Sequence, residues 1–173
     1  KDFAFNNDEV TYDGQAHSIY TTGESDFVTV TYVGNADVNA GTYTVTATIT
    51  TKTNSNYTGS LTKTATLTID KRNLEVTIDN KSGKYLDSLQ TLTYTITSGS
   101  EVTNGEAGIA LSTTATATSN VGTYAITGTF TNTTNYNVTF TNGTYTIAKK
   151  DLTKDDLGDA AYNDETVTYD TQE

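Results

Sequence analysis

Three short motifs occur twice along the chain in the same order, about 80 residues apart. Residues 39–50 (NAGTYTVTATIT) align without a gap with residues 120–131 (NVGTYAITGTFT), at an offset of 81. The pair at 56–57 recurs at 135–136 and the segment 67–72 recurs at 145–150, with offsets of 79 and 78. Conserved order at nearly constant spacing predicts two domains of one design, stacked as neighbours.

A longer period connects the two ends of the sequence. Residues 4–7 and 10–15 recur at 161–164 and 167–172, with an offset of 157. The repeating unit is therefore expected to be a domain pair: residues 1–70, residues 71–150, and a linker with the first strand of the next repeat at 151–173. We expect the strand at 167–170 to pair with an edge of the second domain or with a neighbouring copy. Methionine is absent, so we expect an internal piece of a longer protein.

Apolar and polar side chains alternate within the repeated motifs. In residues 41–50 the apolar members fall on one face and the threonines on the other. This period of two is typical of strands with one face on a core and one in water, as in antiparallel sheets. The same rhythm predicts strands at 28–32, 65–69, 74–78, 92–96, 122–131, 138–140 and 145–147. We expect an all-β fold of two elongated β-sandwich or Greek-key domains arranged end to end.

Two local signals refine this expectation. Asn142-Gly143 lies between the last two predicted strands and is the preferred dipeptide of a two-residue hairpin turn, so these strands are expected to pair directly. A helical period is weak throughout, and residues 153–157 are the one candidate for a short helix.

Composition excludes several classes of function. The net charge is −11, with 10 basic residues that form no run longer than a pair, which argues against binding of a phosphate backbone. The absence of cysteine excludes disulfides and thiolate metal sites. No apolar run approaches the roughly 20 residues of a membrane-spanning helix, so membrane insertion is not expected.

Searching for reactive groups gives no convincing site. His17 is the only histidine and lies in a polar stretch, where a solvated strand residue is favoured over a member of a catalytic triad. Acidic residues cluster at 8–9 and at 155, 156 and 159, but without the alternating spacing of a calcium loop. No facing pair of carboxylates suggests glycosidase chemistry. We therefore expect no enzyme activity, no catalytic or metal-binding residue and no cofactor.

Tyrosines and two lysines leave alternatives open. Tyr43 and Tyr124 lie on the inward face and are expected to pack, as in a tyrosine corner. Four others are expected to pack in the core or between domains, with stacking on a sugar as the alternative: Tyr20, Tyr32, Tyr94 and Tyr136. Lys71 and Lys149, at predicted strand ends, are conceivable donors of isopeptide crosslinks, although an ordinary salt bridge or a free lysine is favoured.

These motifs together resemble a known repeat. The sequence VTYDGQ at 10–15, the Asn-x-Gly-Thr-Tyr blocks, the Asn-Tyr pairs and the basic strand ends at 69–71 and 147–149 resemble the MBG ("mostly β, glycine-rich") and YDG repeats of bacterial surface adhesins, especially mucus- and cell-binding proteins of lactobacilli. The resemblance implies tandem immunoglobulin-like domains on a Gram-positive cell wall, exposed to host mucus or epithelium. It supplies no catalytic residues. Thr171 replaces Gly14 in the terminal copy, so a glycine is not general at this turn.

The expected function is that of an extracellular, cell-wall-anchored adhesin repeat that attaches to a host mucin, glycoprotein or other cell-surface receptor. The alternative is a structural stalk that presents a distal binding domain. Either way, neighbouring repeats are expected partners. Direct binding of this chain to mucin discriminates between the two, and no ligand-contacting residue is identified by the sequence.

Overall fold

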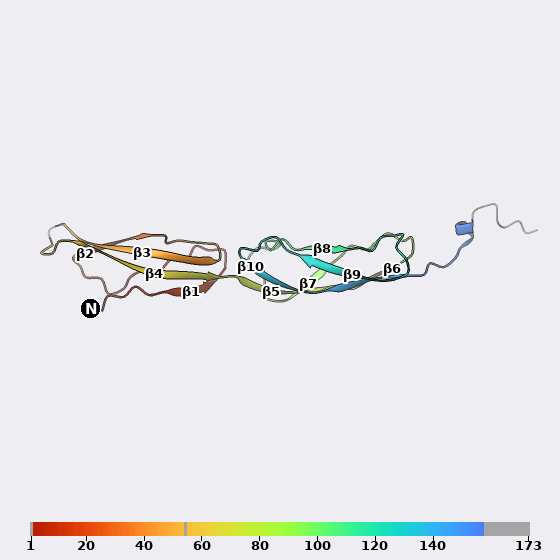
Figure 1. Cartoon of the computed structure of the whole chain (residues 1–173), viewed down its shortest axis with the longest axis horizontal. Coiled ribbons are helices and arrows are strands. Elements are labelled where there is room, and N and C mark those ends of the chain that lie inside the picture. Colours follow the sequence, from red (N-terminus) through yellow and green to blue (C-terminus); the bar gives the residue numbers. More distant parts are fainter. Residues whose placement is uncertain (1, 54, 158–173) are drawn as a thin grey trace, which may run out of the picture.

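The computed structural model describes residues 2–53 and 55–157, which form an elongated all-β molecule (Figure 1). The tandem, all-β architecture predicted from the repeats is therefore confirmed. A 3-10 turn, η1 (Lys154–Leu157), coincides with the predicted helical stretch. The segment at 167–170, expected to pair with a sheet edge, lies outside the described residues. The strands are β1 (Asp8–Thr11), β2 (Val28–Val33), β3 (Gly41–Thr51), β4 (Ser60–Asp70), β5 (Arg72–Ile78), β6 (Lys81–Lys84), β7 (Tyr94–Ser98), β8 (Ala110–Thr113), β9 (Gly122–Thr129), β10 (Tyr136–Thr141) and β11 (Gly143–Ala148).

The first domain is organised around one four-stranded sheet in the order β1-β4-β3-β2. Its long central pair, β3 and β4, is antiparallel, and the alternation read from the sequence places Val45 and Leu67 in the core while threonines face water. The segment before β2 covers the apolar face, because Phe5, Tyr12 and Ile19 are buried against it. The sheet thus acquires a second layer made largely of loop.

The second domain contains two sheets, β10-β5-β7 and β6-β11-β9-β8. Its β6 lies parallel to β11 as β1 lies parallel to β4, with Asp8 opposite Leu67 and Lys81 opposite Tyr145. Because Leu67 and Tyr145 are themselves equivalent in the sequence repeat, the two domains share one topology at this edge. Antiparallel pairing, expected throughout, holds for part of each sheet only: β1–β4, β5–β10 and β6–β11 are parallel.

The three-stranded sheet of the second domain has a reduced counterpart in the first. Thr77 pairs with Thr95 between β5 and β7. Ala4 pairs with Thr22 as an isolated antiparallel bridge. Ala4 lies 73 residues before Thr77, and Thr22 lies 73 residues before Thr95. The same partnership is thus a sheet in one domain and a single bridge in the other.

The predicted hairpin at Asn142-Gly143 is wrong. β10 pairs with β5 and β11 pairs with β9 and β6, so the chain crosses from one sheet to the other at these residues. Gly143 passes close to the main chain of the preceding segment: a Cβ there would lie 2.8 Å from the carbonyl oxygens of Ile78 and Asp79. Gly143 is therefore required for the close approach of two backbones, and not for a turn, although the dipeptide Asn142-Gly143 is the same in both cases.

One hydrophobic cluster extends through both domains. It contains Val45, Leu67 and Ile69 of the first domain together with Leu74 and Tyr136 of the second. A smaller cluster around Ile126, Tyr145 and Ile147 fills the far half of the second domain. Because the larger core continues across the boundary, the contact between the domains is part of the folded interior.

A glycine in β9 tests the packing of the second core. An added Cβ at Gly128 would overlap the Phe140 ring, whereas one at Gly122 of the same strand would meet nothing within 4 Å. We expect Gly128→Ala to lower the free energy of unfolding by about 1–3 kcal/mol through overpacking. Gly122→Ala is expected to leave it unchanged or raise it by about 0.4–1 kcal/mol, by restricting the unfolded chain. Urea denaturation of both variants checks this, and equal midpoints would contradict it.

Candidate functional site

The contact between the two domains brings polar and aromatic side chains together, and it begins with a single connecting residue. β4 ends at Asp70 and β5 begins at Arg72, so only Lys71 separates the last strand of the first domain from the first strand of the second. The chain passes almost straight from one sheet into the next (Figure 1). A connection of one residue leaves little freedom for one domain to turn against the other.

Two tyrosines form the aromatic centre of this junction. Tyr12 directly follows β1 and Tyr136 begins β10. Their rings meet edge to face, with centroids 5.7 Å apart and an interplanar angle of 79°. The two side chains are 5% and 0% exposed. This geometry is favourable beyond the burial of area alone, so the pair fixes both the spacing and the rotation of the domains.

The carboxylate of Glu106 binds both phenols from the second domain. Tyr12 donates its hydroxyl to Oε1, Tyr136 donates to Oε2 at 3.0 Å, and the main-chain N–H of Thr103 donates to Oε2 at 3.1 Å. The bond from Tyr12 is the main reason that the pKa of Glu106 lies below its ordinary value. The same bond, aided by burial, raises the pKa of Tyr12 to about 12. Burial is the main cause of the raised pKa of Tyr136.

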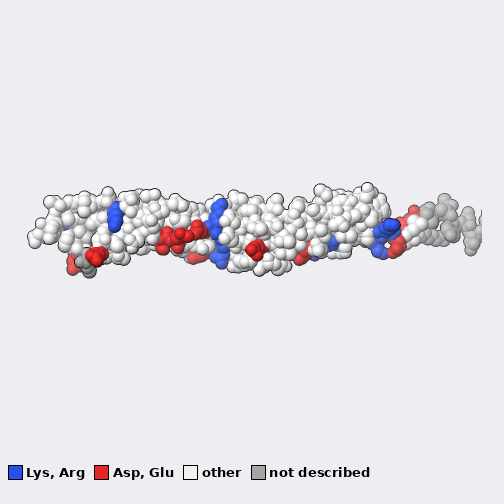
Figure 2. All heavy atoms as spheres, turned by 60° about the horizontal axis from the view of Figure 1, so that its bottom comes forward, with Lys and Arg blue, Asp and Glu red and all other residues white. Residues whose placement is uncertain are grey.

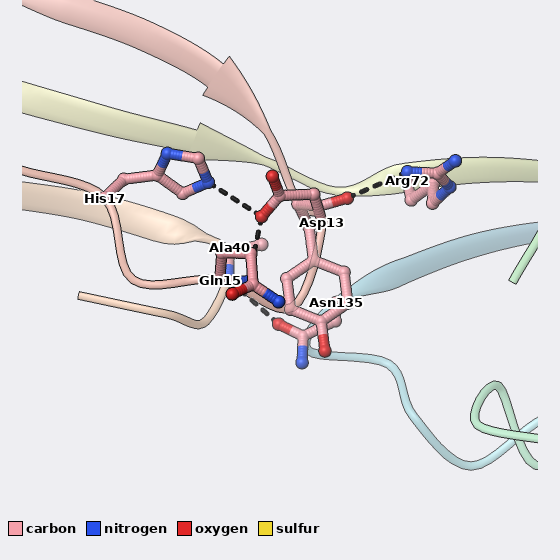
Figure 3. A network of polar contacts seen from close by, with 7 residues as sticks. Asp13, Gln15, His17, Ala40, Arg72 and Asn135 are labelled. Atoms are coloured by element: carbon pink, nitrogen blue, oxygen red, sulfur yellow. Dashed lines mark hydrogen bonds and ion pairs between the residues drawn. The ribbon is translucent and has the colours of Figure 1, made fainter. Parts of the chain in front are cut away.

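Asn135 connects the domains on a second side. Its Oδ1 accepts the N–H of Ala40 at 2.8 Å (Figure 3), and its Nδ2 donates to Oδ1 of Asn39 at 3.1 Å. Its own carbonyl accepts the N–H of Arg72 at 2.8 Å. Asn135 is 6% exposed, so these bonds form in a place where unpaired groups would be costly.

Arg72 supports the junction from the third side. Its Nη1 donates to the carbonyl of Tyr12 at 3.2 Å, and its Nε donates to the carbonyl of Ser100 at 2.6 Å. Lys71 donates its Nζ to the carbonyl of Thr133 at 2.6 Å. A main-chain carbonyl is not an isopeptide acceptor, so the contact of Lys71 is an ordinary hydrogen bond, and Lys149 is exposed.

His17 belongs to the turn beside this junction. Its Nε2 lies 2.8 Å from Oδ1 of Asp13, which also accepts the N–H of Gln15 at 2.9 Å (Figure 3). These bonds, with that of Gln15 first, lower the pKa of Asp13. The backbone of His17 forms an isolated bridge with Asp37. His17 is therefore a half-buried residue that shapes the turn, and it is less exposed than the solvated strand residue that the sequence predicts.

The acidic clusters are engaged in local contacts. Asp70 lies beside Glu9 and raises its pKa. Asp156 accepts hydrogen bonds from Nζ of Lys150 at 2.7 Å and from the N–H of Thr153 at 2.8 Å. These bonds lower the pKa of Asp156, and the bond from Lys150 has the largest effect. Asp159 lies outside the described residues. Within the described part of the chain, no three acidic or histidine side chains are placed to share a metal ion.

The tyrosines singled out in the sequence lie in four environments. Tyr43 and Tyr124 each donate a hydroxyl at 2.7 Å to the carbonyl four residues earlier, which confirms equivalent packing in the two domains. Tyr32 and Tyr94 pack partly buried against the core. The alternative of sugar stacking is wrong for Tyr136, because its ring is fully enclosed.

Tyr20 is the one of the four candidate sugar-stacking tyrosines whose ring remains largely in water. It is 64% exposed and meets Tyr32 edge to face, with centroids 5.2 Å apart. A shallow hollow of about 240 Å³ lies beside it, lined also by Asn6, Asp8 and Ser18. An exposed ring next to amide, carboxyl and hydroxyl groups is a chemistry suited to a saccharide.

Family comparison agrees with the duplicated architecture. Residues 4–73 match the family model described as "MBG domain", and residues 74–146 match the one described as "MBG domain (YGX type)". Comparison with curated proteins gives no match. Among the described residues, no helix is long and apolar enough to cross a membrane.

The junction predicts a stability profile with two limbs. A lowered pKa at Glu106 stabilises the fold above the ordinary carboxyl value of 4.5, and this contribution is lost as pH falls through the lower folded value. A raised pKa at Tyr12 stabilises the fold below the ordinary value of 10.0, and this contribution is lost as pH rises towards 12. We expect the free energy of unfolding to decline at both extremes.

Glu106→Gln is expected to flatten the acid limb and to lower stability at neutral pH by about 1.5–3 kcal/mol, the usual strength of hydrogen bonds to a charged group. Glu75→Gln removes the same charge from an exposed position on β5 and serves as the matched control. Urea unfolding between acid and alkaline pH gives both curves. An acid limb in Glu106→Gln as steep as that of the parent would contradict the role of this carboxylate.

Proposed function

Residues 4–146 belong to the MBG-domain family as two tandem domains, and from this premise we propose that the chain is a stiff spacer repeat of a bacterial surface adhesin. MBG domains are typical of the repeats of such proteins and are binding or structural modules. The observation that supports a spacer is the junction: one hydrophobic core continues from the first domain into the second across a single residue.

Stiffness at each junction makes length additive. If every domain docks on the next as these two do, an array extends in proportion to its number of repeats instead of coiling. The net charge of −11 acts in the same direction, because like charges along the array repel one another. Figure 2 shows acidic and basic side chains in small separated groups on the face in view, without one large charged patch.

The proposal carries finer assignments with it. We place the domain boundary between residues 70 and 71, with the second domain ending at 150 and the segment from 151 leading towards a further repeat. The end of β4 at Asp70 and of β11 at Ala148 supports these limits. An extracellular location on a Gram-positive cell wall follows from the family likeness and is part of the proposal.

Pulsed electron paramagnetic resonance tests the stiffness. Nitroxide labels at Val33→Cys in the first domain and Ala125→Cys in the second, both exposed positions, are unique because the chain has no cysteine. We expect one narrow distance distribution, and a broad one when Tyr12→Ala and Asn135→Ala break the junction. Labels at Val33 and Leu61, both in the first domain, are the control and should stay narrow. A broad distribution across the intact junction would contradict a spacer.

Direct attachment to host mucus or epithelium is the second candidate function. The exposed ring of Tyr20 beside its polar hollow favours it, since a weak saccharide site on each repeat would gain strength from many copies. The partner would be a glycan of a mucin or other glycoprotein.

Binding to immobilised mucin tests this candidate. We expect Tyr20→Ser to weaken saturable binding roughly fivefold, since an aromatic contact contributes about 1 kcal/mol. Tyr57→Ser removes a ring of nearly equal exposure, 63% against 64%, from another surface and should bind like the parent. Absence of saturable binding, or equal loss in both variants, would exclude a site at Tyr20.

A further inference from the structure

Each end of the described structure carries one half of the junction found in its middle. Resting on the spacer function proposed above, we infer that the outer end of the first domain is a docking surface for the opposite end of a second copy of this two-domain unit. We call the two surfaces the distal face (Phe27, Val28, Ile49, Tyr57 and Leu61) and the C-terminal face (Tyr85, Leu86, Asn120, Val121 and Leu152).

The C-terminal face reproduces the half-junction that the first domain presents. Tyr12 follows β1 and its N–H donates to the carbonyl of Asp70 at 2.9 Å; Tyr85 follows β6 and its N–H donates to the carbonyl of Ala148 at 2.9 Å. The two tyrosines thus occupy one position in two domains. Tyr12 is 5% exposed beneath the second domain, whereas Tyr85 is 37% exposed.

The loop beside this tyrosine is repeated as well. Asn39-Ala40, which receives Asn135 across the junction, aligns with Asn120-Val121. Val121 is 53% exposed. A hollow of about 270 Å³ on the same face is lined by Tyr85, Leu86 and Leu152 among others. The C-terminal face therefore offers the same tyrosine and the same asparagine loop, uncovered.

The distal face reproduces the other half. Asn135-Tyr136, which enters the junction, aligns with Asn56-Tyr57 of the first domain. Tyr136 is fully buried, but Tyr57 is 63% exposed and stacks on Phe27 with centroids 4.6 Å apart. The rings border a groove of about 320 Å³ that also contacts Ile49 and Leu61.

Exposed apolar area gathers at the two ends. Of the twelve large hydrophobic residues that the described structure exposes, seven belong to these two faces: Phe27, Tyr57, Leu61, Tyr85, Leu86, Val121 and Leu152. Contiguous exposed apolar surface marks interaction sites in soluble proteins. Docking of one face on the other would cover both sets at once.

The contact is head to tail and does not close, so it extends the rod instead of forming a dimer. The longer sequence period agrees, because residues 161–172 repeat residues 4–15 at an offset of 157. One difference is built in. Phe27 lies beside Tyr57 where Glu106 lies beside Tyr136, so the contact between copies is more apolar than the central one.

Crosslinking of the full chain tests this inference. We expect Asn56→Cys with Asn120→Cys on one chain, treated with a short bis-maleimide at high protein concentration, to give a ladder of linked oligomers. The control is Tyr20→Cys with Asn120→Cys, which places an exposed thiol on the side of the first domain. The first pair should react roughly tenfold faster, the ratio given by about 1.4 kcal/mol of contact free energy. Adding Tyr57→Ser and Leu61→Ser should remove the difference.

Each other result overturns the inference. Equal rates for the two cysteine pairs, or a ladder that survives Tyr57→Ser and Leu61→Ser, would show that the distal face does not dock. Suppression of the ladder by mucin oligosaccharides, with protection of Tyr57 from chemical modification, would make that face a saccharide site. The distance distribution across the central junction is measured separately, so failure of docking between copies remains distinguishable from failure of the spacer function.

Discussion

The structure depends on a hydrophobic core that does not stop at the end of a domain. A domain of about 75 residues buries a smaller fraction of its surface than a larger domain does and has little stability to spare. Here the two domains enlarge that burial by sharing it, since Tyr12 from one and Tyr136 from the other lie in the same cluster. Within the described residues, no buried side-chain nitrogen or oxygen lacks a hydrogen-bond partner. Sharing therefore leaves no polar group stranded, because Glu106 and Asn135 satisfy the groups that the contact encloses.

The two domains share one topology, but the second domain contributes the longer loop to the junction. The second domain has a complete three-stranded sheet and a loop at residues 99–109, and that loop supplies Val102, Thr103 and Glu106 to the junction. The first domain has one bridge between Ala4 and Thr22 in place of that sheet. The segment that leads from Thr95 to β8 in the second domain is longer than its counterpart from Thr22 to β2 in the first. The extra length supplies the carboxylate that joins the two tyrosines.

Much of the fold could be predicted from the sequence, because alternation and duplication are local and periodic signals. The inward face of β3 and the equivalence of Tyr43 and Tyr124 follow from them directly. Strand partners could not be predicted, because β10 alternates in the same way whether it pairs with β11 or with β5. Gly143 looked like a turn glycine, and only the neighbouring carbonyls of Ile78 and Asp79 show why it is a glycine. Glu106 gave no signal, since its loop is longer than the corresponding segment of the first domain and carries none of the repeated motifs.

The parallel pairing of β1 with β4 also decides how this molecule responds to tension. β1 is the edge strand beside β4, and the chain enters β1 from the amino terminus. β4 leads in the same direction through Lys71 into the second domain. A pull along the rod therefore acts in opposite directions on two neighbouring strands, parallel to their length. All the hydrogen bonds between them bear the load together in shear, and none can open first as in a zipper.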